Sequence, residues 1–186
     1  DSTFPNANFP TKAITQAELG KSSKHCKTNK AAAAAAKGKT EAITNGLPAN
    51  ATQLWTDGSA SPNPGPAGAG AILLTPGKEK QEISCALGHS TNNMGELWAI
   101  GTGLEIELAH KAHTGPIHIF TDSKLAIQLL EGKGFSPALS HAAHKIRQCM
   151  FNCNREIHFH HVYSHIGIPN NEAADALATQ GANIST

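Results

Sequence analysis

From residue 52 onward the chain changes its pattern once, from strand-like stretches separated by turns to helices that alternate with strands. The early stretches, rich in apolar and β-branched residues and bounded by Pro and Gly, are "TQLWTD", "GAGAILL" and "KQEISCAL". Short turns join antiparallel neighbours, whereas the later strands at 116–122 and 156–163 follow helices, which favours parallel pairing. The order βββαβααβα therefore predicts an α/β domain with a five-stranded mixed sheet, three strands antiparallel and then two parallel, flanked by helices.

The segments between and after these strands have the spacing of helices. From Asn93 to about His110, apolar residues recur every three or four positions, which places them on one face of a helix. Further helices are expected over 123–132 and 137–153, and a last, alanine-rich helix is expected to begin at Asn171. Helices of this kind pack against a sheet, so the sequence predicts layers around a shared core.

Residues 1–50, which we name the basic arm, differ from the rest of the chain in charge and complexity. They hold seven lysines and three acids, a net charge of +4, whereas the remaining residues sum to −3. Few large apolar residues and a run of alanines at 31–36 leave too little surface to bury for independent folding. We therefore predict a disordered low-complexity tail or linker over 1–50, a folded domain over 51–182 and a short tail over 183–186.

The composition disfavours a membrane-spanning protein and a protein held together by disulfides. No run approaches the roughly 18 apolar residues of a membrane-spanning helix, so no membrane partner is expected. The four cysteines lack the paired spacing of a disulfide framework. We therefore expect no disulfide-linked partner, and an intracellular reducing compartment, the cytoplasm or the nucleus.

Acidic residues stand at corresponding places in the predicted sheet. The first and fourth strands both end on Thr-Asp, at Asp57 and Asp122. If these strands are parallel neighbours, their carboxylates leave the sheet at the same carboxyl-terminal edge, where open α/β sheets place their ligands. Glu96, in the first turn of the long helix, and Asp175, one turn into the last helix, can reach that edge. The pattern therefore predicts four acids around one site.

Four carboxylates this close repel one another and raise each other's pKa values unless a cation neutralises them. Oxygen ligands without a Cys or His cluster favour Mg²⁺ or Mn²⁺. Two such ions about 4 Å apart can activate a water on one side of a phosphorus atom and stabilise the leaving oxygen on the other. We therefore predict phosphodiester hydrolysis with two ions per site, held by Asp57, Glu96, Asp122 and Asp175.

Each acid also has a purely structural interpretation. Asp57 precedes Gly58, and an Asp-Gly pair after a strand commonly forms a turn. Glu96 and Asp175 lie near helix starts, where an acid complements the helix dipole. The joint placement of four acids at two strand ends and on two helices favours a metal site over these separate explanations.

Four ordered blocks give the chain a resemblance to a known family. They are "TDGSASPNPGPAGAGAILL", "STNNMGELWAI", "IFTDSKLAIQLL" and "VYSHIGIPNNEAADALA". In order and spacing they resemble the blocks of the type 1 ribonuclease H family, which cuts the RNA strand of RNA/DNA hybrids, over residues 52 to about 180. The resemblance implies the ribonuclease H-like fold, a hybrid as partner, 5′-phosphate and 3′-hydroxyl products, and metal-binding catalytic roles for Asp57, Glu96, Asp122 and Asp175.

The resemblance also implies roles for residues other than the acids. His165, in the loop "SHIG", matches a family histidine that assists proton transfer or product departure. Glu96 and neighbouring backbone would sense the 2′-OH of the RNA strand, and Thr91 and Asn63 would hold a phosphate of the DNA strand. Asparagines at these places can instead cap a helix or form a turn. The expected substrate-binding residues are Asn63, Thr91, Asn92, Asn93 and Lys124.

The chain departs from the family pattern in three places. Met94 stands where many relatives have Arg, which weakens the proposed DNA-phosphate pocket, and Lys124 stands where Gln is common. The segment "GKGFSPA" is too short for the basic helical protrusion of some cellular members. Retroelement reverse transcriptases carry ribonuclease H domains that also lack this protrusion. The resemblance therefore implies that the chain derives from a retroelement reverse transcriptase, with the remainder of that polyprotein as a partner. Phosphate affinity is then expected from the basic arm, although a solvated linker fits its sequence equally well.

Two other functions are compatible with this fold. A catalytically inactive binding or scaffolding domain would be indicated by the loss of an acid, and all four acids are present. Another polynucleotidyl hydrolase or transferase of the superfamily would use the same metal chemistry on other substrates. The "TNN" block and the His165 loop favour hybrid cleavage. We therefore predict a metal-dependent endoribonuclease that hydrolyses the RNA strand of RNA/DNA hybrids.

Overall fold

The computed structural model describes residues 29–186. Helices and strands alternate along the chain as α2 (Lys30–Asn45), β1 (Thr52–Ala60), β2 (Gly65–Leu74), β3 (Gln81–Ser90), α3 (Asn92–Leu108), β4 (Ile117–Thr121), α4 (Lys124–Leu130), α5 (Ser140–Asn152), β5 (Ile157–His161) and α6 (Pro169–Ile184). From β1 onward this is the predicted order. Within the described residues, no helix combines the length and the apolar character that a bilayer span requires.

The five strands form one mixed sheet in the spatial order β3-β2-β1-β4-β5. β1 pairs antiparallel with β2, and β2 pairs antiparallel with β3. β1 pairs parallel with β4, and β4 pairs parallel with β5. The prediction of three antiparallel strands followed by two parallel ones is confirmed, and β1 and β4 are the central parallel neighbours that the site requires.

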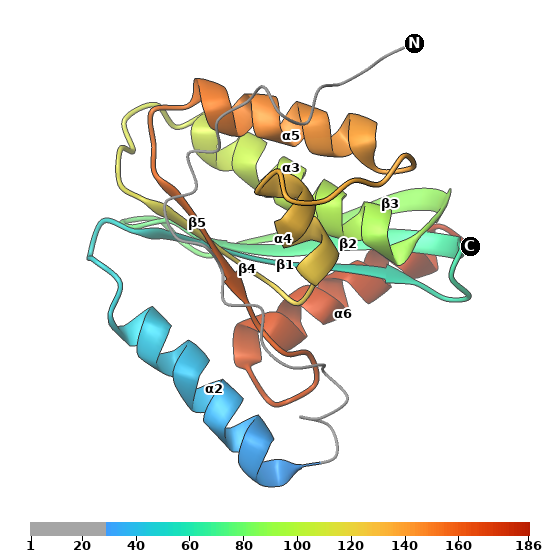
Figure 1. Cartoon of the computed structure of the whole chain (residues 1–186), viewed down its shortest axis with the longest axis horizontal. Coiled ribbons are helices and arrows are strands. Elements are labelled where there is room, and N and C mark those ends of the chain that lie inside the picture. Colours follow the sequence, from blue (N-terminus) through green and yellow to red (C-terminus); the bar gives the residue numbers. More distant parts are fainter. Residues whose placement is uncertain (1–28) are drawn as a thin grey trace.

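Helices cover both faces of the sheet, with α3, α4 and α5 on one face and α6 and α2 on the other (Figure 1). Successive strand residues point to opposite faces, so Leu54 joins the core beneath α3 whereas Trp55 joins a second core on the α6 face. Phe120 on β4 pairs with Trp55 in register, and their rings stack with centroids 4.1 Å apart. This pair fixes β1 against β4 a short distance before the predicted acids.

Three predicted boundaries near the acids are corrected by the structure. β1 does not end at Asp57 but continues to Ala60, still paired with β2. Asp57 and Gly58 are therefore extended strand residues, and the interpretation of this pair as a turn is wrong. The last helix begins at Pro169 rather than Asn171 and runs to Ile184, two residues into the predicted tail.

The basic arm is not without structure where it is described. Residues 30–45 form α2, which Asn29 caps by accepting hydrogen bonds from the amides of Ala31 and Ala32 at 3.0 and 3.1 Å. The prediction of a disordered linker is wrong for this helix. Residues 1–28 of the predicted tail, Cys26 among them, lie outside the described residues. Cys85 and Cys149 are free cysteines, and the Cys153 thiol donates to the carbonyl of Met150 at 3.2 Å.

Candidate metal and active site

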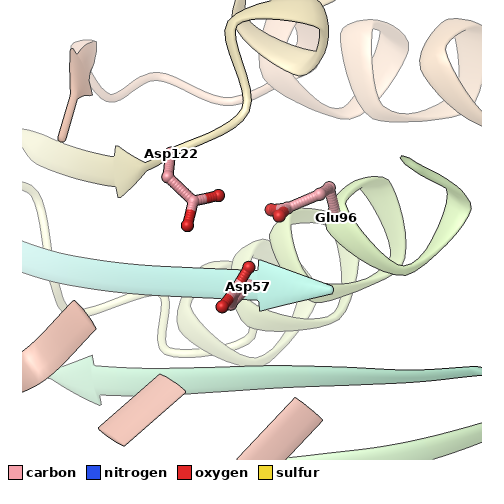
Figure 2. Close-up of side chains that lie close together, drawn as sticks. All are labelled: Asp57, Glu96 and Asp122. Atoms are coloured by element: carbon pink, nitrogen blue, oxygen red, sulfur yellow. The ribbon is translucent and has the colours of Figure 1, made fainter. Parts of the chain in front are cut away.

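Asp57 and Asp122 come together because the parallel pairing of their strands stops just before them. The β1–β4 ladder ends with Thr56 opposite Thr121, so the next residue of each chain segment is an aspartate at the same edge. Asp57 remains in β1, whereas Asp122 lies in the turn between β4 and α4. Their side chains point toward one another across this edge (Figure 2).

Glu96 reaches the same point because the first turn of α3 lies directly on β1. A Cβ at Gly58 would collide with the backbone of Asn92 and Glu96, so the absence of a side chain at Gly58 permits this approach. Thr91 caps α3 by accepting a hydrogen bond from the Met94 amide at 3.1 Å. Thr121 donates a hydrogen bond to Glu96 Oε2 at 3.2 Å and holds the carboxylate at the sheet edge.

The acids surround one polar cavity of about 240 Å³. Asp57, Glu96 and Asp122 each offer a carboxylate oxygen, and these oxygens lie within 4.8 Å of one another. Asp57 and Glu96 are each only 6% exposed. Asp175 of α6 and His165 also line the cavity, so the structure brings together the predicted catalytic residues that the sequence places on five different segments.

The carboxylates oppose each other's ionisation. Burial raises the pKa of Asp57 to about 8, and the charges of Asp122 and Asp175 also raise it. A hydrogen bond with Glu96 lowers this pKa and offsets part of the rise. Burial, together with the charges of Asp122 and Asp57, raises the pKa of Glu96 well above its ordinary value. The pKa of Asp122 is also raised, first by burial, although the charge of His165 counteracts part of the rise.

This site fits a divalent cation. The residues that line the cavity include no lysine and no arginine. The donor set consists of carboxylate oxygens, which hard cations prefer. A bound cation would let all three carboxylates ionise at neutral pH, because it supplies the positive charge that the protein does not.

His165 stands at the rim of the cavity on a loop of defined shape. It has a positive φ of 59°, in the left-handed region that residues other than glycine seldom occupy. The loop follows β5 directly and leads into α6, so its two ends are held by a sheet strand and by the helix that carries Asp175. This loop brings an imidazole next to the acids.

The predicted substrate-binding residues separate into two groups. Asn63 and Asn92 bind one another, since Asn63 Nδ2 donates to Asn92 Oδ1 at 2.8 Å and the Asn92 amide donates to Asn63 Oδ1 at 3.2 Å. Of the predicted five, Asn92 alone lines the acidic cavity. Thr91 is occupied as the cap of α3, and Asn93 is exposed on the first turn. Lys124 is half-buried at the start of α4, close enough to His161 to lower its pKa.

Two residues of the site were missed by the sequence interpretation. Asn171 is 3% exposed and opposes the rise of the Asp122 pKa, although its buried Nδ2 has no hydrogen-bond partner among the described residues. Asn171 precedes Asp175 by four residues, and this helical spacing is the signal that could have found it. His161 lines the cavity, and burial, followed by the charge of Lys124, lowers its pKa to about 4. No sequence signal distinguishes it from the other histidines of "HFHH".

Comparisons with known proteins agree with this architecture. The family model described as RNase H matches residues 49–183. Ribonuclease H of Desulforamulus reducens is 33% identical over 145 residues, which covers 69% of this chain and 86% of that protein. Ribonuclease H of Cupriavidus metallidurans is 33% identical over 147 residues, which covers 72% of this chain and 97% of that protein.

Solved structures share the fold. The N-terminal RNase H domain of a Mycobacterium tuberculosis protein superposes with a TM-score of 0.62 at 26% identity, covering 73% of this chain and 95% of that one. LC11-RNase H1, solved in complex with an RNA/DNA hybrid, superposes with a TM-score of 0.63 at 24% identity, covering 72% of this chain and 98% of that one.

Proposed function

We propose that this chain, which belongs to the ribonuclease H family, is an endonuclease that hydrolyses the RNA strand of RNA/DNA hybrids with the help of divalent cations. One observation carries the proposal. The carboxylate oxygens of Asp57, Glu96 and Asp122 lie within 4.8 Å of one another at a cavity whose lining residues include no lysine or arginine. Buried acids without compensation destabilise a fold, and they are expected where a cation and a phosphate must bind.

The residues have distinct roles in the proposed mechanism. Asp57 lies on the central strand with its carboxylate near those of Glu96 and Asp122, and it is the best candidate for a ligand that two Mg²⁺ or Mn²⁺ ions would share. Glu96, Asp122 and Asp175 would be the remaining ligands. When bound, such ions supply an activated water and stabilise the leaving oxygen of an in-line displacement. The products would then carry 5′-phosphate and 3′-hydroxyl ends. Thr121 orients Glu96, and His165 moves a proton or assists departure of the product.

The asparagine pair supports a role in substrate contact. The reciprocal hydrogen bonds of Asn63 and Asn92 join the β1–β2 turn to the start of α3 beside the cavity. Both amides are part of a rigid polar surface that can contact the backbone and the 2′-hydroxyls of a hybrid without reading its sequence. We assign the hybrid minor groove to this side of the cavity, with Thr91, Asn93 and Lys124 as further contacts.

The basic arm would add non-specific affinity for phosphates. The loop at residues 131–139 between α4 and α5 holds no helix, so it offers no basic protrusion. If the arm binds the hybrid, its contribution falls steeply with salt, because released counterions drive the association. Removal of residues 1–28 should then raise KM at low salt and change it little at high salt. An unchanged KM at every salt concentration would leave residues 1–28 with no role in binding. Association with a reverse transcriptase stays a prediction.

One assay tests the proposed activity. A labelled RNA/DNA hybrid, duplex RNA and duplex DNA are incubated with the full chain, with Mg²⁺ or with a chelator, and the ends of the products are analysed. Cleavage of the hybrid alone, only with Mg²⁺, is the expected result. Asp57→Asn should remove cleavage while the circular dichroism spectrum stays unchanged. Full activity in that variant, or intact RNA strands under every condition, would contradict the proposal.

A further inference from the structure

Helix α2 lies outside the stretch that matches the family, yet it packs on the domain beside the active site. The family match begins at residue 49, whereas α2 ends at Asn45. In Figure 1 the connection between β5 and α6 lies on the same side of the sheet as α2. This connection, residues 162–168, is named here the His165 loop. α2 and the segment that delivers a residue to the acidic cavity therefore share one side of the sheet.

The His165 loop has a backbone shape that depends on what surrounds it. His165 and Gly167 both have a positive φ, of 59° and 85°, on either side of Ile166. Val162 and Ile168, at the two ends of the loop, are buried in the core that contains Trp55 and Phe120, and Ile166 packs against that core. A left-handed conformation at a residue other than glycine persists where neighbouring contacts hold it. The anchors at Ile166 and Ile168 therefore determine where His165 points.

Residues of α2 and of the segment just after it pack against the same core as Ile166 and Ile168. Ile43 of α2, and Leu47 just after it, pack against the same cluster as Ile166. Thr40, one turn before Ile43, is 6% exposed. Lys37, one turn earlier still, places its ammonium 3.6 Å from the position that a Cβ of Gly167 would take. One face of α2 thus covers the second core and reaches the middle of the His165 loop.

We propose that α2 is a clamp that holds the His165 loop against the sheet and so keeps His165 at the rim of the acidic cavity. Ile43 and Lys37 are positioning residues, since they act through the loop and touch no reacting group. The catalytic part of this inference rests on the proposed function, whereas the contact between α2 and the loop does not. The clamp would make turnover depend on a helix that lies outside the stretch matching the family.

Two neighbouring positions of α2 offer a matched pair of variants. Ile43 is partly buried against the second core, whereas Ala42 is exposed on the same helical turn. Ile43→Asn places an amide against apolar side chains and should release α2, while Ala42→Asn introduces the same neutral side chain in solvent. Neither variant changes the charge near the cavity. Ile43→Ala is the milder substitute if Ile43→Asn fails to fold.

Hydrogen exchange of the full chain tests the contact directly. The Val162 amide donates to the Thr121 carbonyl at 2.9 Å, so peptides that span residues 162–168 report release of the loop. Exchange in these peptides should rise several-fold in Ile43→Asn or Ile43→Ala and stay at the parental rate in Ala42→Asn. Parental exchange in a folded Ile43 variant would overturn the clamp, even if the chain cleaved no hybrid.

A double-mutant cycle tests the route through His165. Ile43→Asn should lower kcat for the hybrid about 10-fold with little change in KM, because a displaced catalytic group loses effective concentration. In a His165→Ala background the same substitution should cause no further loss, since the group that it displaces is gone. An equal loss in both backgrounds would overturn the positioning role. Absence of cleavage in the parental chain would instead refute the proposed function and leave the exchange result to decide the contact.

Discussion

Glu96 and Glu107 lie about three turns apart on the same face of α3, and both are buried against the sheet. Glu96 stands over the edge where the β1–β4 ladder ends, near Asp57 and Asp122. Glu107 stands over the opposite edge, where β1 begins at Thr52. One helix thus buries two carboxylates at the two ends of the same parallel strands.

The surroundings of Glu107 satisfy its charge. Thr75 and Thr52 donate hydrogen bonds to it at 2.6 and 3.1 Å, and Arg155 Nη1 does so at 2.8 Å. His113 approaches within 3.1 Å. Burial alone would raise the pKa of Glu107, but the hydrogen bonds from Thr75 and Arg155 and the Arg155 charge outweigh it and leave that pKa lowered. This carboxylate is therefore part of a closed structural network.

The surroundings of Glu96 leave its charge uncompensated. The Thr121 hydroxyl donates a hydrogen bond to Glu96 at 3.2 Å, whereas the charged neighbours Asp57 and Asp122 repel this carboxylate. Burial therefore raises the pKa of Glu96, aided by these neighbours. The comparison teaches that burial of an acid does not indicate a site, whereas burial without a matching cation from the protein does.

Glu96→Gln should have the largest effect, and it should fall on activity. An amide keeps the shape of the side chain but weakens a metal ligand, so loss of about 4 kcal/mol of transition-state stabilisation would slow cleavage roughly 1000-fold. The melting temperature of the metal-free protein should stay equal or rise, because a buried acid with a raised pKa is removed. Steady-state kinetics and thermal unfolding measure both, with Glu105→Gln as the exposed control on the same helix. If Glu96→Gln kept the kcat of the parental chain, the proposed difference between the roles of Glu96 and Glu107 would be wrong.

Glu107→Gln should instead lower the stability of the protein and leave its activity almost unchanged. Arg155 is 5% exposed and would lose its charged partner in the interior. Breaking a buried ion pair from one side costs about 3–5 kcal/mol, which corresponds to a fall in melting temperature of roughly 10 °C for a domain of this size. Cleavage well below the melting temperature should stay near the parental rate. A stable Glu107→Gln variant would show that Thr52 and the Gly115 carbonyl suffice as hydrogen-bond partners of Arg155.

The smallest effect is the pH dependence of the metal-free protein. The pKa of Asp57 rises from 3.8 to about 8 on folding, so the folded state binds more protons than the unfolded chain between these values. Stability from this group is therefore present below its unfolded pKa and lost as the pH rises through about 8. The melting temperature in chelator should fall between about pH 5 and pH 8, and Mg²⁺ should raise it at pH 8. The slope of the melting temperature against pH should be smaller in Asp57→Asn. An equal slope in that variant would show that another group causes the pH dependence.

Most of the sheet could be predicted because its signals are local. The alternation of apolar residues, the Pro and Gly turns and the helical stripe on α3 each lie within one segment. The Thr-Asp pairs at the predicted ends of the first and fourth strands then indicated a shared edge, given parallel pairing. The extension of β1 to Ala60 was missed because Asp57-Gly58 has the composition of a turn, whereas the close approach of α3 requires this glycine in a strand.

The ionic partners could not be predicted in the same way. Glu107 and Arg155 are separated by 48 residues, and neither position differs in local sequence from an exposed charge on a helix or in a loop. The same limit applies to α2, where alanine and lysine indicate a solvated tail but Ile43 and Leu47 supply two apolar anchors. Such pairings depend on which surfaces meet after the elements pack.

The order of strands and helices, the parallel placement of β1 and β4, and the presence of four acids near one sheet edge follow from the amino-acid sequence, because they depend on periodicity and chain connectivity. Which acid is compensated by an arginine, which is left to a cation, and what holds the His165 loop were decided by the tertiary structure alone. The physical reason is that charge compensation and burial depend on distances between residues far apart in the chain, and packing sets those distances.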